Sequence, residues 1–273
     1  MTHDASPLGR QTDYPDRYDA SLLFSMPRAP LRAALGLTGS LPFAGVDLWT
    51  AHEITWLDAH GKPELAVGHF RVPADSPQIF ESKSLKLYLG SFAQERLGGG
   101  RSEVAATIER DLARASGALV AVELAAPSGD SCRQPALLPG DSLDGIELAA
   151  DVYEPAPELL ATSGAYAEET LRSALFRSLC PVTGQPDFGD VMIRYRGPKI
   201  ARPGMLRYLI SYRRHAAFHE NCVERMFVDV LRACAPQGLS VYARFLRRGG
   251  IDINPFRSNF EAAPPHDVRT VRQ

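Results

Sequence analysis

The segment 178–188 places a thiol and a carboxyl group seven positions apart, at Cys180 and Asp187, with two prolines and a glycine between them. A thiolate is a strong nucleophile, and a neighbouring acid can give and take protons. Together they supply the minimum chemistry for covalent attack on a polar multiple bond. Taken alone, such a pair is more often a buried cysteine followed by an aspartate that caps a turn.

Three more segments combine acids, bases and glycines in a fixed order along the chain. They contain Glu81-Ser82-Lys83, Phe218-His219-Glu220 and Arg247-Arg248-Gly249-Gly250. With the 178–188 segment, they resemble the NADPH-dependent 7-cyano-7-deazaguanine reductases, the nitrile reductases of queuosine biosynthesis. The resemblance covers nearly the whole chain, including residues 14–23 and 41–56, and is to the long form of the family, which has two modules in one chain.

The resemblance implies a catalytic set of Cys180, Asp187 and His219. Cys180 would add to the nitrile carbon and form a covalent thioimide, which accepts hydride from NADPH much better than a nitrile does. Loss of the thiol leaves an imine, and a second NADPH completes a four-electron reduction to the aminomethyl product. Asp187 would protonate the nitrogen, and His219 would bind substrate and handle protons.

The same resemblance implies a substrate site for a guanine analogue, whose N1–H and 2-amino groups form a row of donors. A carboxylate matches such an edge with two charge-assisted hydrogen bonds, and Glu81 and Glu220 are the candidates. Phe218 would cover the base by stacking. Phe80, Ser82 and His219 complete the expected set. For Glu81, the sequence leaves open a second role as the acid at the start of a helix.

For NADPH, the chain has no Gly-x-Gly-x-x-Gly between a strand and a helix, so we do not expect a Rossmann domain. The family motifs match at Ser82, Lys83, Arg248 and Gly249. Lys83 and Arg248 can neutralise phosphate, and a glycine lets the backbone approach closely. Without the family, the arginine-glycine segment is typical of a solvated hairpin tip. The sequence leaves open which basic residue contacts the 2′-phosphate.

Composition narrows the partners and the metal chemistry. The 273 residues carry a formal net charge of −2, which argues against bulk nucleic-acid binding. The four cysteines (132, 180, 222 and 234) lack the spacing of a zinc site or a disulfide framework, so we expect no metal. The sequence shows no secretory signal and no membrane span, which predicts a cytoplasmic protein. The family suggests a homodimer, with no direct nucleic-acid or membrane contact.

The elements that must position these residues form a faint duplication at an offset of 121 residues. Residues 84–89 and 117–124 match residues 205–210 and 238–245, and a helical pattern lies between them in each half, at 104–115 and 223–234. Two strands precede the first copy, at 46–57 and 64–72. A strand at 190–196 with a turn at Gly197-Pro198 precedes the second.

Strands followed by helices in each half predict an α+β protein. The resemblance implies two tandem tunnelling-fold modules, residues 1–140 and 141–273, each an antiparallel sheet with helices on one face, the second carrying Cys180. Two alternatives use other chemistry: a pterin-type cyclohydrolase on the same fold, which depends on zinc or a different acid–base set, and a non-catalytic nucleotide- or tRNA-binding protein.

Overall fold

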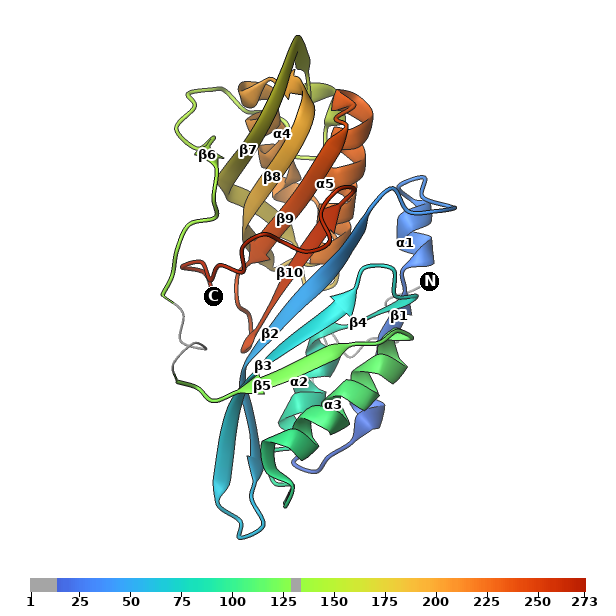
Figure 1. Cartoon of the computed structure of the whole chain (residues 1–273), viewed down its shortest axis with the longest axis vertical. Coiled ribbons are helices and arrows are strands. Elements are labelled where there is room, and N and C mark those ends of the chain that lie inside the picture. Colours follow the sequence, from blue (N-terminus) through green and yellow to red (C-terminus); the bar gives the residue numbers. More distant parts are fainter. Residues whose placement is uncertain (1–13, 129–133) are drawn as a thin grey trace. The chain divides into compact units, whose positions relative to one another are not determined.

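The computed structural model describes residues 14–128 and 134–273, which form two compact units (Figure 1). The first unit comprises the described residues of Met1–Ala34, Asp47–Arg133 and Arg247–Ile253. The second comprises Leu35–Val46, Gln134–Leu246 and Asn254–Gln273. Both units contain strands and helices, and the predicted α+β class is confirmed. A module boundary at residue 140 stays a prediction.

The first unit is a sheet covered on one face by two helices (Figure 1). Its strand order is β5-β3-β2, followed by the first residues of β10. Its strands are β2 (Ala44–Leu57, from Asp47 on), β3 (Pro63–Pro73), β5 (Ala121–Ala125) and a separate antiparallel pair, β1 (Ser25–Pro27) and β4 (Gln78–Phe80). Its helices are α1 (Ala29–Ala33), α2 (Ser82–Gly90), α3 (Gly100–Ser116) and a short 3-10 helix, Ala20–Leu22.

The core of the first unit lies between that sheet and helices α2 and α3. On α3, the apolar residues at helical spacing, Val104, Ile108 and Leu112, are fully buried, which confirms the helix predicted over 104–115. The helix ends at Gly117, whose φ of 71° is a left-handed conformation that glycine adopts without strain. The chain then continues into β5.

The second unit repeats this architecture, with α4 and α5 on one face of its strands (Figure 1). Its strand order is the end of β10, then β9-β8-β7-β6. Its strands are β6 (Asp141–Ser142), β7 (Thr162–Leu179), β8 (Pro186–Ile200), β9 (Gly238–Phe245) and β10 (Ile251–Ser258, from Asn254 on). Its helices are α4 (Arg202–Ser211), α5 (His219–Cys234) and the 3-10 helices Pro157–Leu159 and Tyr212–Arg214. The order of two strands, two helices and a strand is therefore common to both units.

One local prediction is wrong: Gly197 and Pro198 do not form a turn, because β8 continues through them to Ile200. The pairing of β8 with β9 ends at Arg196, opposite Gly238, whereas Pro198 still pairs with Tyr166 of β7. A proline has no N–H to donate, and it fits where a strand has a neighbour on one side alone. Proline therefore marks a local edge of the sheet here.

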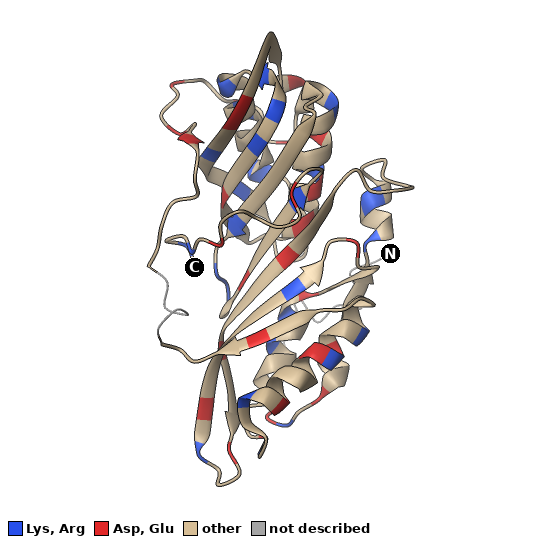
Figure 2. Ribbon diagram, in the orientation of Figure 1, with Lys and Arg blue, Asp and Glu red and all other residues tan. Residues whose placement is uncertain are grey.

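Charged residues are distributed over both units. Figure 2 shows lysine and arginine mixed with aspartate and glutamate along the elements of each unit, in keeping with the net charge of −2. Over residues 14–128 and 134–273, each helix is too short or too polar to cross a membrane.

Candidate active site

Cys180 opens the tight turn that joins β7 to β8 in the second unit. Its N–H donates to the carbonyl of Gln185 at 2.9 Å, and the N–H of Gly184 donates to the Cys180 carbonyl at 3.0 Å. Gly184 has a φ of 67°, which supplies the left-handed residue that this turn needs. The cysteine is free and 7% exposed. The turn thus fixes the backbone on both sides of the thiol.

Strand register places Asp187 on the same face as Cys180. Ser178 pairs with Asp187 across the β7–β8 ladder, and Leu179 pairs with Pro186. Side chains alternate along a strand, so Ser178 and Cys180 point to one face, and Asp187 points there as well. Diagonal neighbours on one face of such a ladder lie within reach of each other. The seven-residue spacing seen in the sequence therefore places Cys180 and Asp187 at the same end of the β7–β8 ladder.

Helix α5 begins beside the end of β7. The N–H of Leu179 donates to the His215 carbonyl at 2.8 Å, and the N–H of Ala217 donates to the Leu179 carbonyl at 3.1 Å. This short parallel bridge leads to Phe218, the N-cap of α5, and to His219 in its first turn. A helix N-terminus favours negative charge nearby, such as a thiolate or a nitrogen-bound anion. The position of the helix therefore suits nucleophilic chemistry at Cys180.

His219 contacts the acid directly. Its Nε2 atom lies 3.3 Å from Oδ2 of Asp187, and the two side chains are 12% and 4% exposed. The imidazole lies flat on Phe245, with ring centroids 3.8 Å apart and an interplanar angle of 5°. In the described part of the chain, Nδ1 of His219 has no hydrogen-bond partner. The ring is thus held by one polar contact and one aromatic neighbour, and one nitrogen is left for a ligand.

The neighbours of His219 complete the candidate site in this unit. Glu220 is 3% exposed, in the first turn of α5, and Phe218 is half-buried at its N-cap. One turn further, Cys222 lies against Ser178, and burial raises the pKa of its thiol to about 12. Burial likewise raises the pKa of Cys234 to about 11. These two thiols are therefore poor nucleophiles at neutral pH.

In the first unit, Glu81 is the N-cap of α2 and is 1% exposed. One carboxylate oxygen accepts from the N–H of Lys83 at 2.6 Å, and the other accepts from the N–H of Ser84 at 2.9 Å. The helix-start role that the sequence left open is therefore the one observed. Oε2 accepts this one hydrogen bond from Ser84 and keeps a further lone pair for a ligand, so capping does not exclude a substrate contact.

Phe80, immediately before Glu81, lies in the core of the first unit. Its side chain is 2% exposed and packs at a tilt on Trp49, with centroids 4.9 Å apart. It therefore fixes the position of the helix start through packing. Ser82 is half-buried, and its hydroxyl lies 3.4 Å from the Glu81 carboxylate.

The residues expected to bind the cofactor also come together in the first unit. Arg248 and Ile251 exchange backbone hydrogen bonds of 2.9 and 3.3 Å, which close a tight turn around Gly249. Gly249 has a φ of 58°, and a Cβ atom at this position would lie 3.1 Å from Cε of Lys86. The turn therefore lies against α2, the helix that also carries Lys83.

Two residues of these clusters, Lys86 and Phe245, were not predicted from the sequence. Lys86 follows Lys83 by three positions on α2, a spacing that places both on one helix face and that could have been noticed. Phe245 gives no local signal, because its contact with His219 depends on the pairing of distant strands. Within the described ranges, no group of three or more His, Cys, Asp and Glu side chains is arranged to hold a metal ion.

The structure thus gathers the predicted site residues into two sets. The second unit holds Cys180, Asp187, Phe218, His219 and Glu220. The first holds Phe80, Glu81, Ser82, Lys83, Arg248 and Gly249.

Family models match both parts of the chain. Residues 14–124 match a model described as the N-terminal part of the nitrile reductase 7-cyano-7-deazaguanine reductase. Residues 186–264 match a model described as QueF-like protein. The second match begins one residue before Asp187 and includes His219 and Phe245.

Relatives are similar over their full length. The chain is 55% identical over 275 aligned positions to the NADPH-dependent 7-cyano-7-deazaguanine reductase of Burkholderia ambifaria, covering 100% of both chains. It is 53% identical to the reductase of the same name from Bordetella pertussis, again over 100% of both chains. The one from Chromobacterium violaceum is 54% identical, with 100% of this chain and 98% of the relative covered.

Proposed function

The chain belongs to the NADPH-dependent 7-cyano-7-deazaguanine reductases, and we propose that it reduces the nitrile of 7-cyano-7-deazaguanine to an aminomethyl group in queuosine biosynthesis, through a covalent adduct on Cys180. The observation that supports this mechanism most directly is the Asp187–His219 contact on the sheet face that carries the cysteine turn. Cys180, Asp187 and His219 would supply a nucleophile, an acid and a second proton carrier, and all three lie in the second unit.

In the first step, Cys180 loses its S–H proton to the Asp187–His219 pair, its sulfur forms a bond to the nitrile carbon, and one C–N π bond breaks. Its electron pair moves to the nitrogen, which takes a proton and leaves a neutral thioimide. The N-terminus of α5 stabilises negative charge that develops near sulfur or nitrogen in this step. The backbone hydrogen bonds of the 180–185 turn hold Cys180 in place while the bond forms.

Asp187 gives the proton to the nitrogen, and His219 replaces it. Their contact of 3.3 Å is short enough for a small adjustment to form a hydrogen bond during the reaction. Asp187 is buried and His219 is mostly buried, so water does not compete strongly for the proton. A second proton is needed when the imine is reduced, and the free Nδ1 of His219 offers a path for it within the described residues.

The first unit has features that fit a phosphorylated cofactor. Lys83, Lys86 and Arg248 are cationic, and Gly249 presents backbone without a side chain beside them. These residues would hold the phosphates of NADPH, and Ser82 would add a hydroxyl contact. When bound, NADPH supplies hydride, and two equivalents provide the four electrons that a nitrile needs to become an amine.

Substrate recognition is assigned to carboxylates. Glu220 is buried in the first turn of α5, next to His219, and can accept from the N1–H and 2-amino groups of the base. Glu81 stays the other proposed substrate carboxylate, and its orientation is fixed in advance by its hydrogen bonds to α2. Phe218 is half-buried and provides an apolar ring to cover the base.

Intact-protein mass spectrometry tests this proposal. Mixing the protein with 7-cyano-7-deazaguanine in the absence of NADPH should add the mass of one substrate molecule, and adding NADPH should remove it. A chain that acts on purines by zinc-dependent hydrolysis, or that binds nucleotides without catalysis, would show no such shift. Absence of the adduct together with NADPH-dependent turnover would refute the covalent route while leaving the reductase activity in place.

We further infer that the two units are tunnelling-fold modules and that two copies of the chain associate. The common order of two strands, two helices and a strand supports the first inference. Multi-angle light scattering over a tenfold range of protein concentration tests the second. A mass of one chain, 29.8 kDa, at every concentration would contradict association.

A further inference from the structure

Phe245, the aromatic residue on which His219 lies, is held by ring packing and by hydrogen bonds to its backbone. Phe245 is fully buried, and it stacks on His219 with one face while its edge meets Phe176, at a centroid distance of 5.8 Å and an angle of 84°. It is the last residue of β9. Where a strand ends, its backbone groups need partners other than the ladder.

Two side-chain amides supply these partners. The N–H of Phe245 donates to Oδ1 of Asn254 at 3.1 Å, and its carbonyl accepts from Nε2 of Gln273 at 3.3 Å. The two amides are also linked, because Nε2 of Gln273 donates to Oδ1 of Asn254 at 2.6 Å. Both residues are buried. Asn254 and Gln273 thus form a closed set of hydrogen bonds around the Phe245 backbone, which we call the amide clamp.

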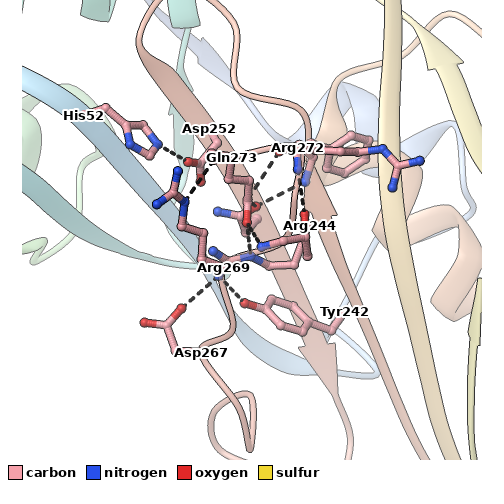
Figure 3. Close-up of polar contacts among 11 residues, drawn as sticks. His52, Tyr242, Arg244, Asp252, Asp267, Arg269, Arg272 and Gln273 are labelled. Carbon is pink, nitrogen blue, oxygen red and sulfur yellow. Dashed lines mark hydrogen bonds and ion pairs between the residues drawn. The ribbon is translucent and has the colours of Figure 1, made fainter. Parts of the chain in front are cut away.

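Gln273 is held in this position from its other side (Figure 3). Its Oε1 atom accepts from Nε of Arg244 at 2.9 Å and from the N–H of Thr270 at 3.1 Å. Arg244 in turn donates to the hydroxyl of Tyr242 at 2.7 Å and to Asp267 at 2.8 Å.

The rest of the segment 267–273 is also bonded to the second unit. Nη1 of Arg272 lies 2.6 Å from Oδ1 of Asp190 on β8, and its Nη2 donates to the Ala174 carbonyl on β7 at 2.7 Å. Nε of Arg269 donates to the main-chain carbonyl of Gln273 at 2.9 Å. A segment far in sequence from Cys180 is therefore fixed against the strands that carry the site.

We propose that Asn254 and Gln273 are positioning residues for the reaction: the amide clamp fixes Phe245, and Phe245 fixes the plane in which the His219 imidazole meets Asp187. This rests on the proposed role of His219 in proton transfer. Displacing a catalytic group by about an ångström can cost up to about a hundredfold in rate. Residues that hold His219 in place can therefore change the rate without touching the substrate.

The variant Gln273→Glu separates the clamp from the attachment of the segment. A carboxylate keeps an acceptor for Arg244 and Thr270, so the segment 267–273 stays attached. It has no hydrogen to donate to Asn254 or to the Phe245 carbonyl, so the clamp opens. Gln273→Met, which lacks both functions, serves as a second variant. The matched control is Val271→Ala, in the same segment at a side chain that is 79% exposed.

Two measurements are needed together. In Gln273→Glu, kcat should fall by about ten- to a hundredfold while the KM for the deazapurine stays near the wild-type value and the adduct still forms without NADPH. In protein with ¹³C-labelled histidine, the ring protons of His219 should lose part of the ring-current shift imposed by Phe245. Their signals are assigned by their loss in His219→Gln. Val271→Ala should match the wild type in both measurements.

The proposal is overturned if the His219 signals stay at their wild-type positions in both Gln273 variants, or if they move while kcat is unchanged. Failure of the proposed function is recognised separately. If His219→Gln turns over at the wild-type rate, then His219 carries no proton, whatever the ring-current shifts show about its position.

Discussion

The side chains of Asp187 and His219 contact each other through Oδ2 and Nε2, although 31 residues separate them in the sequence. The contact depends on two pairings: Asp187 lies opposite Ser178 in the β7–β8 ladder, and the segment before α5 runs parallel to the end of β7. The acid and the imidazole should therefore act as one unit, and substitutions at the two positions should not be additive.

Cys180→Ala should abolish both turnover and the covalent adduct and leave the protein folded, because the residue lies at a turn that is held by backbone hydrogen bonds. Mass spectrometry and far-UV circular dichroism measure the two results. Cys222→Ala is the matched control and should form the adduct normally. Nitrile reduction by Cys180→Ala above the level without enzyme would refute the covalent mechanism.

Asp187→Asn should uncouple adduct formation from reduction. The nucleophile remains, but protonation of the nitrogen loses its acid, so turnover should fall by at least about a hundredfold. Adduct that forms should persist after NADPH is added, and stopped-flow absorbance at 340 nm together with intact mass follows both events. Reduction at the wild-type rate would mean that His219 or another group supplies the proton.

Glu81→Ser should weaken deazapurine binding by about ten- to a hundredfold, since about 1.4 kcal/mol corresponds to a factor of ten and a lost charge-assisted hydrogen bond costs about 1–3 kcal/mol. Serine still caps α2, so the melting temperature should change little. Glu81→Leu is the comparison: it should lose the same affinity and, in addition, about 1 kcal/mol of stability with the cap. Isothermal titration measures binding.

The same titrations with NADPH provide the control for Glu81. Affinity for NADPH should stay within about twofold in Glu81→Ser, because the phosphates of NADPH are assigned to Lys83, Lys86 and Arg248. A twofold change in affinity is well below the tenfold change that corresponds to about 1.4 kcal/mol. Unchanged deazapurine affinity in both Glu81 variants would limit this residue to its role as a helix cap.

His215 should make stability depend on pH. Burial, and secondly the charge of Arg225, lowers the pKa of its imidazole from 6.5 to about 4. Because the unfolded chain binds this proton more readily, the contribution of His215 is complete above pH 6.5 and is lost as the pH falls toward 4. Urea titrations should show wild type losing about 1 kcal/mol more than His215→Gln between pH 7 and 5, a figure reduced for solvent screening of the partly exposed ring. Equal losses would contradict the shift.

Much of the fold could be predicted from local patterns, because a helix that packs on one face has apolar residues at helical spacing in its sequence. The helical spacing of 104–115 and 223–234 predicted α3 and α5 correctly. The turn at Gly197-Pro198 was wrong because the fit of a proline depends on whether a second strand lies beside it, which only the assembled sheet decides.

The candidate site also combines features that local sequence predicts with features that depend on the assembled fold. Motifs predicted Cys180, Asp187 and His219 as site residues, but their arrangement in one unit follows from strand register and from a parallel bridge between segments distant in sequence. Phe245 and Gln273 carried no signal, because a buried phenylalanine and a glutamine are ordinary residues outside this set of contacts.

The difference between the described cysteines has a practical consequence. Cys222 and Cys234 are 0% and 2% exposed in the hydrophobic core, and burial raises the pKa of both thiols, whereas Cys180 is 7% exposed and lies at a turn. A small alkylating reagent at neutral pH should therefore modify Cys180 in preference to these two. Protection from alkylation then provides a binding assay for deazapurines without nitriles, which neither react with the enzyme nor consume cofactor, and so gives access to inhibitors that a turnover assay ranks poorly.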